Sequence, residues 1–452
     1  MNYDILNELF DTNTFVQTNS YVVSALTDNS EAGDGVITGY GSVEGRAVFA
    51  AIQDESVLKG SVGVTHAQKI CSCIEMAVKA GSPFVFFVDS AGARINEGLD
   101  VLGGYGKIIK SLSAAIGEIP TIAVITGKCT GASSLIASMV DFTVMTDDGY
   151  FAFSGVDSLA ATTLKDVKTL GSAKGAAATG KVSLTASNRA ESFILIKDLL
   201  CYLPDNCECS CAEIESNDDF NRAINASSFD TFSNYDVREL IVQLADNGKF
   251  FELSKDFAPN AVTGFAHVGN KTVCFIANQP SVENGLITTN ACNKISAVLA
   301  FCDKFSIPVI TLTNTCGFAV SVDEETAGIS AAAALLATSY ANSEITKINI
   351  ITGKAYGSAY LVMNGKNTGA DIVYAWDKAD ISVITPEAGA LLLYNNEIKA
   401  SSDPVAAREE YINKYRMENS SPMQAAYKGL VDDVIPSSQT RARIISALYL
   451  LD

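Results

Sequence analysis

Two turns made of small residues are the parts of this sequence best suited to chemistry. One is ITGKCTGAS around Gly127 and the other is ITGKAYGSA around Gly353, and each lies between an isoleucine-rich segment and helix-like sequence. The first N–H groups of a helix have no partner within the helix, and small side chains let a ligand oxygen approach such donors closely. We therefore expect both turns to bind an anion or a developing oxyanion, with packing alone as the alternative.

A second pair of turns follows another strand-like segment in each half of the chain. These turns are DSAGAR, with Ala91 and Gly92, and NTCGF, with Cys316 and Gly317. They could supply further backbone donors. One donor that is already oriented towards a developing oxyanion stabilises a transition state by roughly 2.7–4 kcal/mol.

Side chains that usually act as acids, bases or nucleophiles are scarce. His66 and His267 are the only two histidines, and we expect the first to cap or pack a helix and the second to pack in a strand. Glu97 is the one obvious acid beside these turns, and it suggests a general acid or base as an alternative mechanism. No GxxxxGK[ST] phosphate loop and no HExxH zinc motif occurs in the sequence. Backbone donors are therefore the expected catalytic groups.

The cysteines do not suggest a metal site. The chain has 11 of them, and all are scattered except for one cluster whose spacing lacks the paired CxxC units of a tetrahedral zinc site. We expect reduced thiols and no bound metal. The cluster consists of Cys201, Cys207, Cys209 and Cys211.

Short apolar segments alternate with alanine-rich segments, which is the pattern of a covered, largely parallel sheet in an α/β protein. The alternation that includes PFVFFVDS, IPTIAVITG and DFTVM in the first half returns in the second, where the apolar segments include NKTVCFIAN, IPVITLTN, KINIITG and ADIVYAW. Gly127 and Gly353 are 226 residues apart (353 minus 127), and Gly92 and Gly317 are 225 apart (317 minus 92). Two independent landmarks with nearly the same offset indicate a tandem duplication of one domain.

The expected domains are residues 1–205 and 235–452, separated by an acidic, polar linker over 206–234. With 32 Lys+Arg against 51 Asp+Glu, the net charge is −19, which argues against nucleic acid as a partner. No apolar run is long enough to cross a bilayer. The first residues are acidic where a signal peptide would be basic, so we expect a cytoplasmic protein.

Long segments of the chain resemble a known family. They include VDSAGARINEGLDVLGGYGKI, IPTIAVITGKCTGA, KAYGSAYLVMNGKNTGADIVYAW and KGLVDDVIPSSQTRARI. These are similar to the biotin-dependent acyl-CoA carboxyltransferases, which comprise the carboxyltransferase β subunits of propionyl-CoA and acetyl-CoA carboxylases and their decarboxylase α-subunit and transcarboxylase relatives. The resemblance covers nearly the whole chain in collinear order.

The resemblance implies an α/β fold of two tandem crotonase-like ββα superhelix domains, assembled as a hexamer (a dimer of trimers). Acyl-CoA is expected on the N-terminal domain of one subunit, and carboxybiotin on the C-terminal domain of another. By resemblance, the amides of Gly131 and Ala132 hold the thioester oxygen as it becomes an enolate. Those of Ser358 and Ala359, after Gly357, hold the biotin ureido oxygen. The biotin nitrogen then takes the α-proton, and no side-chain base is needed.

Other expected site residues follow from the same resemblance. Arg94 and Lys128 are candidates for coenzyme A phosphate contacts, with ordinary salt-bridged or solvated side chains as the alternative. At Ala132 and Ser358 the family usually has glycine, which leaves the N–H available but makes the approach tighter. The expected substrate-binding set is Ala91, Gly92, Arg94, Lys128 and Leu361, and the expected biotin-side set is Cys316, Gly317 and Phe318.

The expected function is transfer of a carboxyl group between biotin and a short-chain acyl-CoA, such as acetyl- or propionyl-CoA. The sequence contains no biotinylation segment and no ATP-binding half. We therefore expect a separate biotin carboxyl carrier protein, and either a biotin carboxylase or membrane decarboxylase subunits, as partners. The first alternative is the α subunit of a decarboxylase acting on malonyl-, methylmalonyl- or glutaconyl-CoA. The others are a biotin-independent crotonase-type enzyme and a non-catalytic subunit.

Overall fold

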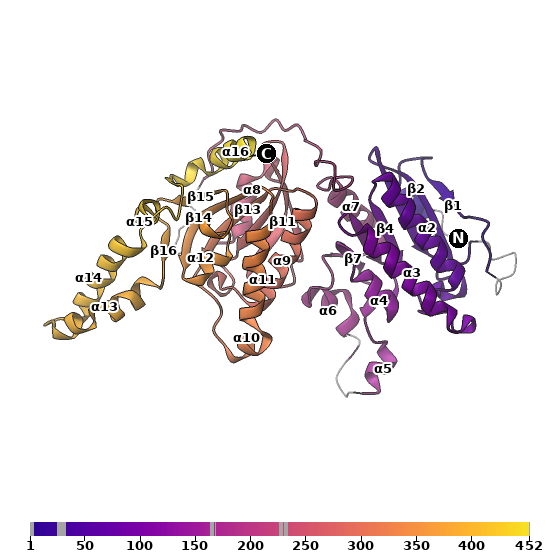
Figure 1. Ribbon diagram of the computed structural model, residues 1–452, viewed down its shortest axis with the longest axis horizontal. Coiled ribbons are helices and arrows are strands. Elements are labelled where there is room, and N and C mark those ends of the chain that lie inside the picture. Colours follow the sequence, from indigo (N-terminus) through magenta and orange to yellow (C-terminus); the bar gives the residue numbers. More distant parts are fainter. Residues whose placement is uncertain are drawn as a thin grey trace. The chain divides into compact units, whose positions relative to one another are not determined.

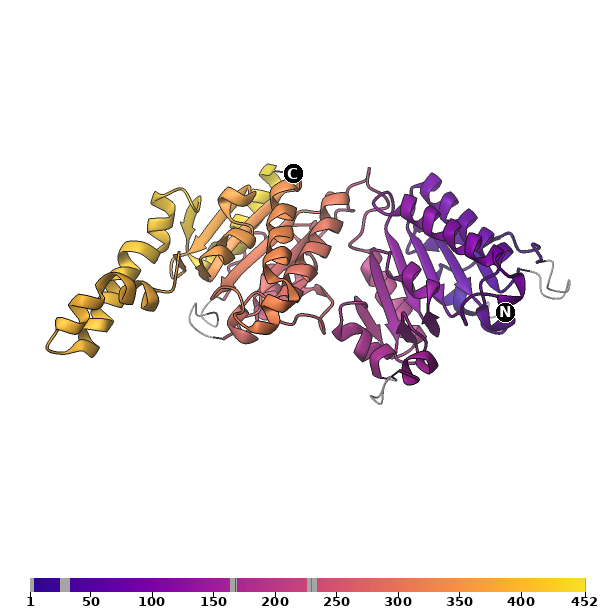
Figure 2. The same cartoon turned by 60° about the horizontal axis from the view of Figure 1, so that its bottom comes forward.

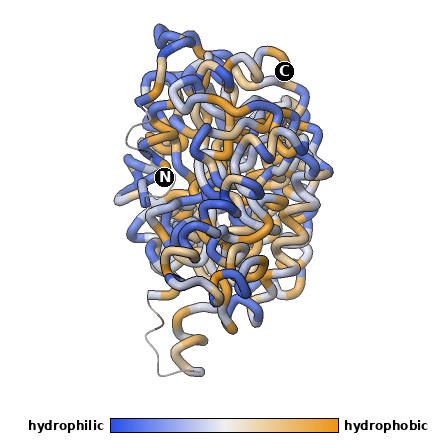
Figure 3. Tube along the Cα trace, turned by 90° about the vertical axis from the view of Figure 1, so that its left-hand side faces the viewer, coloured by the Kyte–Doolittle hydropathy of each residue, from blue (hydrophilic) through white to orange (hydrophobic). Residues whose placement is uncertain are grey.

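The computed structural model describes residues 4–24, 33–162, 167, 169–225, 229 and 234–451. The chain divides into two compact units, residues 1–211 and 212–452. Each unit is built around a twisted sheet with helices packed on it (Figure 1). Short apolar stretches separated by polar ones follow the trace, as expected for buried strands joined by exposed turns (Figure 3).

The N-terminal unit has a seven-stranded sheet in the order β1-β2-β3-β4-β5-β7-β9. The first two pairings are antiparallel, and all those from β3 onward are parallel. β6 pairs with β8 in a separate two-stranded sheet. The strands are β1 (Val16–Thr18), β2 (Val36–Val43), β3 (Arg46–Gln53), β4 (Phe84–Val88), β5 (Thr121–Ile125), β6 (Lys128–Thr130), β7 (Phe142–Thr146), β8 (Tyr150–Ala152) and β9 (Leu184–Ala186).

Every residue of the parallel strands β4, β5 and β7 is buried, because helices cover a parallel sheet on both faces. The helix α2 ends at Ala80, and the next residue, Gly81, terminates it in the left-handed conformation with a φ of 60°. The helices are α1 (Asp4–Leu9), α2 (Val64–Ala80), α3 (Asp100–Ala115), α4 (Ala132–Ala137), α5 (Val156–Ala160), α6 (Ala173–Ala178) and α7 (Arg189–Leu200).

The C-terminal unit repeats this topology. Its strands run β10-β11-β12-β13-β14-β15-β17, and β16 pairs with the end of β14. Again the first two pairings are antiparallel and the rest are parallel. The strands are β10 (Phe250–Leu253), β11 (Ala261–Val268), β12 (Lys271–Asn278), β13 (Val309–Thr315), β14 (Lys347–Tyr356), β15 (Ile372–Trp376), β16 (Asp380–Ser382) and β17 (Asp433–Ile435).

Two helices of this unit, α13 and α14, lie side by side and project away from its sheet (Figures 1 and 2). A π-helical turn, η9 (Arg416–Ser420), follows them and leads back to the sheet. The helices of the unit are α8 (Val237–Leu244), α9 (Thr289–Lys304), α10 (Val322–Ala327), α11 (Ile329–Asn342), α12 (Ser358–Val362), α13 (Pro386–Ala400), α14 (Pro404–Tyr415), α15 (Pro422–Tyr427) and α16 (Thr440–Leu451).

Equivalent buried lysines show how closely the two units correspond. In the N-terminal unit, the Lys69 ammonium donates to the carbonyls of Gly33 and Val36 at 2.7 and 2.5 Å. In the C-terminal unit, Lys294 donates to the carbonyl of Ala261, at the start of β11, at 2.7 Å. Burial lowers the pKa of both lysines to about 8. The duplicated α/β fold expected from the sequence is thus built with the same internal supports in both copies.

The boundary between the units lies inside 206–234, the segment expected to be a linker. Residues on both sides of the boundary are packed. The Asn206 side chain donates to the carbonyl of Gly81 at 2.9 Å, and Ile224 and Phe229 are buried in the core of the C-terminal unit. The part of this segment that can act as a linker is therefore shorter than expected. Among the described residues, no helix is both long and apolar enough to cross a membrane.

Candidate active site

The turn after β6 presents two free backbone donors. Gly131 has φ 59° and ψ −131°, a conformation that L side chains rarely adopt. Its own N–H donates to the carbonyl of Phe153 at 2.9 Å. Within the described part of the chain, the N–H groups of the next two residues, Ala132 and Ser133, have no acceptor.

The turn after β14 has the same geometry. Gly357 has φ 57° and ψ −138°, and its N–H donates to the carbonyl of Ser382 at 2.8 Å. The N–H groups of Ser358 and Ala359 are left without an acceptor among the described residues. Each unit therefore ends a parallel strand in a glycine turn followed by two adjacent unpaired donors.

This arrangement corrects one expected donor. The sequence suggested the amides of Gly131 and Ala132 as the pair in the N-terminal unit, but the ladder between β6 and β8 continues into the bond from Gly131 to Phe153. The available pair is therefore Ala132 and Ser133. It matches Ser358 and Ala359 at an offset of 226 residues.

The turns are held in place by matching side chains at the ends of β4 and β13. Asp89 accepts from the N–H of Lys128 at 3.1 Å, and Asn314 accepts from the N–H of Lys354 at 3.0 Å. A Cβ on Gly127 would lie 2.1 Å from the Asp89 carboxylate, and one on Gly353 would lie 2.4 Å from the Asn314 amide. Glycine is required at both positions because the supporting side chain lies against the backbone. Burial raises the pKa of Asp89.

The structure places Arg94 in the interior. Its guanidinium, 5% exposed, pairs with Asp34 at 2.7 Å and with Glu97 at 3.0 Å. Burial raises the pKa of Asp34, against the lowering effect of Arg94. Arg94 is thus a buried, salt-bridged side chain, and we do not retain Arg94 as a contact for a coenzyme A phosphate. Lys128 is exposed and stays a candidate.

Glu97 binds the N-terminus of α2. Its Oε2 accepts from the N–H of Val64 at 2.6 Å, at the start of α2. In the C-terminal unit, Glu324 accepts from the N–H of Thr289 at 2.7 Å, at the start of α9. A carboxylate is favourable at a helix N-terminus. Because Glu97 is already bound to Arg94 and to α2, this geometry does not support Glu97 as a general acid or base.

His66 is fully buried in α2. Its Nδ1 donates to the carbonyl of Asp34 at 2.9 Å, which leaves Nε2 to accept from the amide of Gln53 at 3.2 Å. Burial lowers the pKa of His66 to about 3, so this ring is neutral at physiological pH. Burial also lowers the pKa of His267. The geometry of His66 fits the packing role expected for it.

The second pair of turns offers fewer donors than expected. The N–H of Gly92 donates to the Ser90 hydroxyl at 3.1 Å, and that of Gly317 donates to the Thr315 hydroxyl at 3.2 Å. Ala91 is exposed, and its N–H donates to the carbonyl of Lys59. These hydrogen bonds stabilise the two turns, and the N–H groups that form them are not available to a ligand. Two biotin-side candidates, Cys316 and Phe318, are half-buried beside Gly317.

The cysteine cluster has no metal-site geometry. Cys201, Cys207, Cys209 and Cys211 are all free thiols. Throughout the described residues, no group of three or more His, Cys, Asp or Glu side chains is placed to hold a metal ion.

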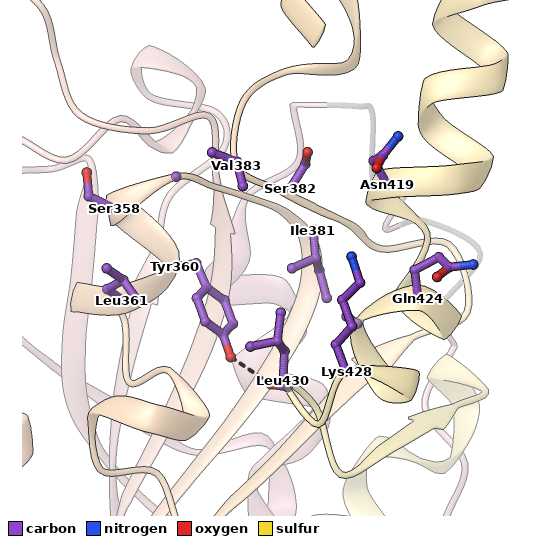
Figure 4. A pocket seen from close by; sticks show the side chains of 12 residues that line it. Ser358, Tyr360, Leu361, Ile381, Ser382, Val383, Asn419, Gln424, Lys428 and Leu430 are labelled. Carbon is purple, nitrogen blue, oxygen red and sulfur yellow. Dashed lines mark hydrogen bonds between the residues drawn. The ribbon is translucent and has the colours of Figure 1, made fainter.

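A pocket of about 530 Å³ opens beside the Gly357 turn (Figure 4). The Tyr360 hydroxyl closes one side by donating to the carbonyl of Leu430 at 2.7 Å. Gly357, Ser358 and Leu361 were expected from the sequence, but the lining residues from β16, η9 and α15 were not, because no motif singles them out. The lining residues are Gly357, Ser358, Tyr360, Leu361, Ile381, Ser382, Val383, Asn419, Gln424, Ala425, Lys428 and Leu430.

The fold and the two donor turns define a duplicated α/β enzyme of the crotonase-like class, in which main-chain N–H groups stabilise negative charge on a carbonyl oxygen. The carboxyl transferase domain family matches residues 3–452, and the chain belongs to this family. The resemblance, the fold class and the enzyme class expected from the sequence, a biotin-dependent acyl-CoA carboxyltransferase, are thereby confirmed.

Three relatives illustrate this membership. The methylmalonyl-CoA carboxyltransferase 12S subunit of Propionibacterium freudenreichii subsp. shermanii is 36% identical over 98% of this chain and 87% of its own. A putative propionyl-CoA carboxylase beta chain of Bacillus subtilis is 37% identical over 98% and 89%. The methylmalonyl-CoA decarboxylase subunit alpha of Propionigenium modestum is 35% identical over 98% and 88%.

A solved structure of a member of this family has the same fold. One chain of the transcarboxylase 12S crystal structure, a hexamer assembly with hydrolysed methylmalonyl-coenzyme A bound, superposes with a TM-score of 0.94 and 36% identity. The match covers 99% of this chain and 88% of that one.

Proposed function

We propose that this chain transfers a carboxyl group between biotin on a separate carrier protein and a short-chain acyl-CoA of the propionyl-CoA type. The observation that carries the proposal is the pair of equivalent donor turns, Ala132–Ser133 and Ser358–Ala359. Two carbonyl oxygens must hold negative charge in this reaction, one on each substrate. The chain offers one unpaired donor pair for each.

We assign the acyl-CoA thioester to the N-terminal unit and biotin to the C-terminal unit. The N–H groups of Ala132 and Ser133 would bind the thioester oxygen and stabilise the enolate as the α-proton leaves. Lys128 is exposed beside that turn and would contact a coenzyme A phosphate. Cys316, Gly317 and Phe318 would border the biotin side.

The pocket in the C-terminal unit fits a bicyclic urea. Its walls include Leu361, Ile381 and Val383, and Ser358, the first residue of the donor pair, also lines it. When bound, biotin supplies the nitrogen that carries the carboxyl group and takes up the α-proton. The chain's part is to bind both carbonyl oxygens, orient the two reacting carbons and exclude water.

The functional assembly is proposed to be a homohexamer with a biotin carboxyl carrier protein and either a biotin carboxylase or membrane decarboxylase subunits as partners. The hexameric relative supports the first part of this proposal. Sedimentation of the purified chain tests it. We expect a hexamer, and a stable monomer would contradict the intersubunit site.

Decarboxylation is the second candidate function, because two decarboxylase alpha subunits are 35% identical to the chain over 98% and 99% of its length. The purified chain is incubated with methylmalonyl-CoA or malonyl-CoA, with and without free biotin. Loss of the carboxyl group only when biotin is present supports biotin-dependent chemistry. Turnover without biotin would instead indicate a crotonase-type enzyme. Inactivity even with a biotinylated carrier would indicate a non-catalytic subunit.

A further inference from the structure

The short strand β16 holds the donor turn of the C-terminal unit in place. Its last carbonyl, on Ser382, accepts the N–H of Gly357, and its residues Ile381 and Ser382 line the pocket beside that turn (Figure 4). β16 has three residues and, among the described strands, pairs only with the end of β14. So short a ladder has little stability of its own, and side-chain contacts are needed to fix β16.

Two adjacent residues supply those contacts where α14 passes into the π-helical turn η9. The Arg416 Nε donates to Asp380 Oδ2 at 3.4 Å, and the Tyr415 hydroxyl lies 3.2 Å from the Ser382 hydroxyl. The Tyr415 ring is itself packed on α13, since a Cβ on Gly389 would lie 2.4 Å from the ring. The helices α13 and α14 are thus joined to the strand that holds the donor turn.

Arg416 neutralises a carboxylate that is almost completely buried. Asp380 Oδ2 also accepts the Tyr356 hydroxyl at 3.0 Å. Asp380 Oδ1 has no hydrogen-bond partner among the described residues, and no second cation there forms an ion pair with this carboxylate. A buried carboxylate that loses its cation is left uncompensated. Loss of Arg416 therefore favours a displacement of β16 that lets water reach Asp380.

The N-terminal unit holds its own donor turn without a charge. There the carbonyl of Phe153, just after β8, accepts the N–H of Gly131. β8 has the sequence YFA, so none of its residues is charged. Loss of the ion pair between Arg416 and Asp380 should therefore disturb one donor turn and leave the other unchanged.

We propose that Tyr415 and Arg416 position the free N–H groups of Ser358 and Ala359 for the ureido oxygen of biotin. This inference rests on the proposed function, which assigns biotin to the C-terminal unit. Neither positioning residue has to touch the substrate, because both hold β16, β16 holds Gly357, and Gly357 directly precedes the two donors. Oxyanion donors are effective when they are held within about 0.5 Å of the productive position.

The test measures steady-state decarboxylation of methylmalonyl-CoA by the purified full chain, with free biotin as the second substrate. In Arg416→Met, the KM for biotin should rise about tenfold or more, while the KM for methylmalonyl-CoA should change less than about twofold. A purely structural role would reduce the amount of folded enzyme, and so the maximal rate, without separating the two KM values. Arg443→Met, which removes an ion pair with Asp433 in the same unit, is the matched control and should change neither KM.

A double variant tests whether Arg416 acts through Asp380. Asp380→Asn removes the buried charge and keeps an oxygen that can accept the Tyr356 hydroxyl. Adding Arg416→Met to Asp380→Asn should raise the KM for biotin less than about twofold, because no charge remains to be neutralised. A rise as large as the one in the wild-type background would overturn the inference.

Tyr415→Phe is a milder change, which keeps the ring on Gly389 and removes only the hydroxyl. The KM for biotin should rise about threefold, whereas Tyr449→Phe, which breaks the bond to the Gly269 carbonyl, should leave it unchanged. An unchanged KM for biotin in Tyr415→Phe or in Arg416→Met, or an equal rise in both KM values, would also overturn the inference. Wild-type protein without biotin-dependent turnover would instead refute the proposed function.

Discussion

The hydroxyl of Tyr356 donates a hydrogen bond to the carboxylate of Asp380, with 3.0 Å between the two oxygens. Tyr356 directly precedes Gly357, and Asp380 begins the short strand whose last carbonyl, on Ser382, accepts the Gly357 N–H. Asp380 is only 1% exposed, and Arg416 lies 3.4 Å away. Burial, and then the negative charge of Asp380, raise the pKa of Tyr356, so its hydroxyl remains a donor.

Removing that hydroxyl should destabilise the C-terminal unit. In Tyr356→Phe, Asp380 loses its hydroxyl donor while it stays buried, and the expected cost is about 1–3 kcal/mol in the free energy of unfolding. Urea denaturation measures this. Tyr427→Phe, which alters a 74% exposed tyrosine, is the control and should cost almost nothing. Equal stability of the two variants would show that the Tyr356–Asp380 bond contributes nothing.

Gly131→Ala should reduce catalysis without a steric clash. A Cβ at Gly131 would meet no atom within 4 Å, so the strain comes from its φ of 59° alone. Relieving the strain, about 1–3 kcal/mol, rotates the donors of Ala132 and Ser133, and we expect kcat to fall on the order of 10²-fold.

Gly98→Ala is the matched control for this change. Gly98 has φ 62° and ψ −138°, also with open space around it, and lies outside the donor turn. It should lose similar stability but keep its kcat. A Gly131→Ala enzyme with normal kcat would contradict the assignment of this turn.

Asp89 can be exchanged for the residue that the other unit uses. Because Asn314 supports its turn with an amide oxygen, Asp89→Asn should keep activity, whereas Asp89→Ala should lose it, since the Lys128 N–H then has no acceptor. Initial rates of biotin-dependent decarboxylation compare the variants. An inactive Asp89→Asn would show that the charge itself is required.

The wild type and Asp89→Asn should also differ in how their stability depends on pH. Burial raises the pKa of Asp89 in the folded state. Asp89 therefore ionises less readily in the folded protein than in the unfolded chain, where its pKa is about 3.9. As the pH rises above that value, ionisation of Asp89 lowers the free energy of unfolding. At pH 7, Asp89→Asn should be at least as stable as the wild type. Its advantage should shrink as the pH falls towards 4. Thermal unfolding across this range measures the difference, and an advantage that grows at low pH would contradict it.

Thiol reactivity should separate buried from accessible cysteines. Burial raises the pKa of Cys73 to about 12, and Cys209 is exposed. With a disulfide reagent at pH 8, Cys209 should react first and the buried cysteines only after denaturation in urea. Mass spectrometry identifies the modified residues. Rapid native labelling would contradict the fold if it occurred at Cys71, Cys73, Cys129, Cys274, Cys292 or Cys302.

Local patterns in the sequence determined the repeat, the α/β class and the location of the two main turns. Gly131 and Gly357 are recognisable because they lie in turns of small residues between a strand-like and a helix-like segment, and strand and helix periods are properties of neighbouring residues. The family followed from long collinear segments. None of these conclusions requires knowledge of which distant residues meet.

The tertiary structure decided which donors are free and which charges are available. The N–H of Gly131 is not available to a ligand because it donates to the carbonyl of Phe153. The Arg94 guanidinium forms an ion pair with Asp34, 60 positions earlier in the chain. Leu430 lies in the pocket beside Ser358, where its carbonyl accepts a hydrogen bond from Tyr360, 70 positions earlier in the chain. Hydrogen bonds and ion pairs depend on distances of a few ångströms, and between remote segments only the folded chain sets those distances.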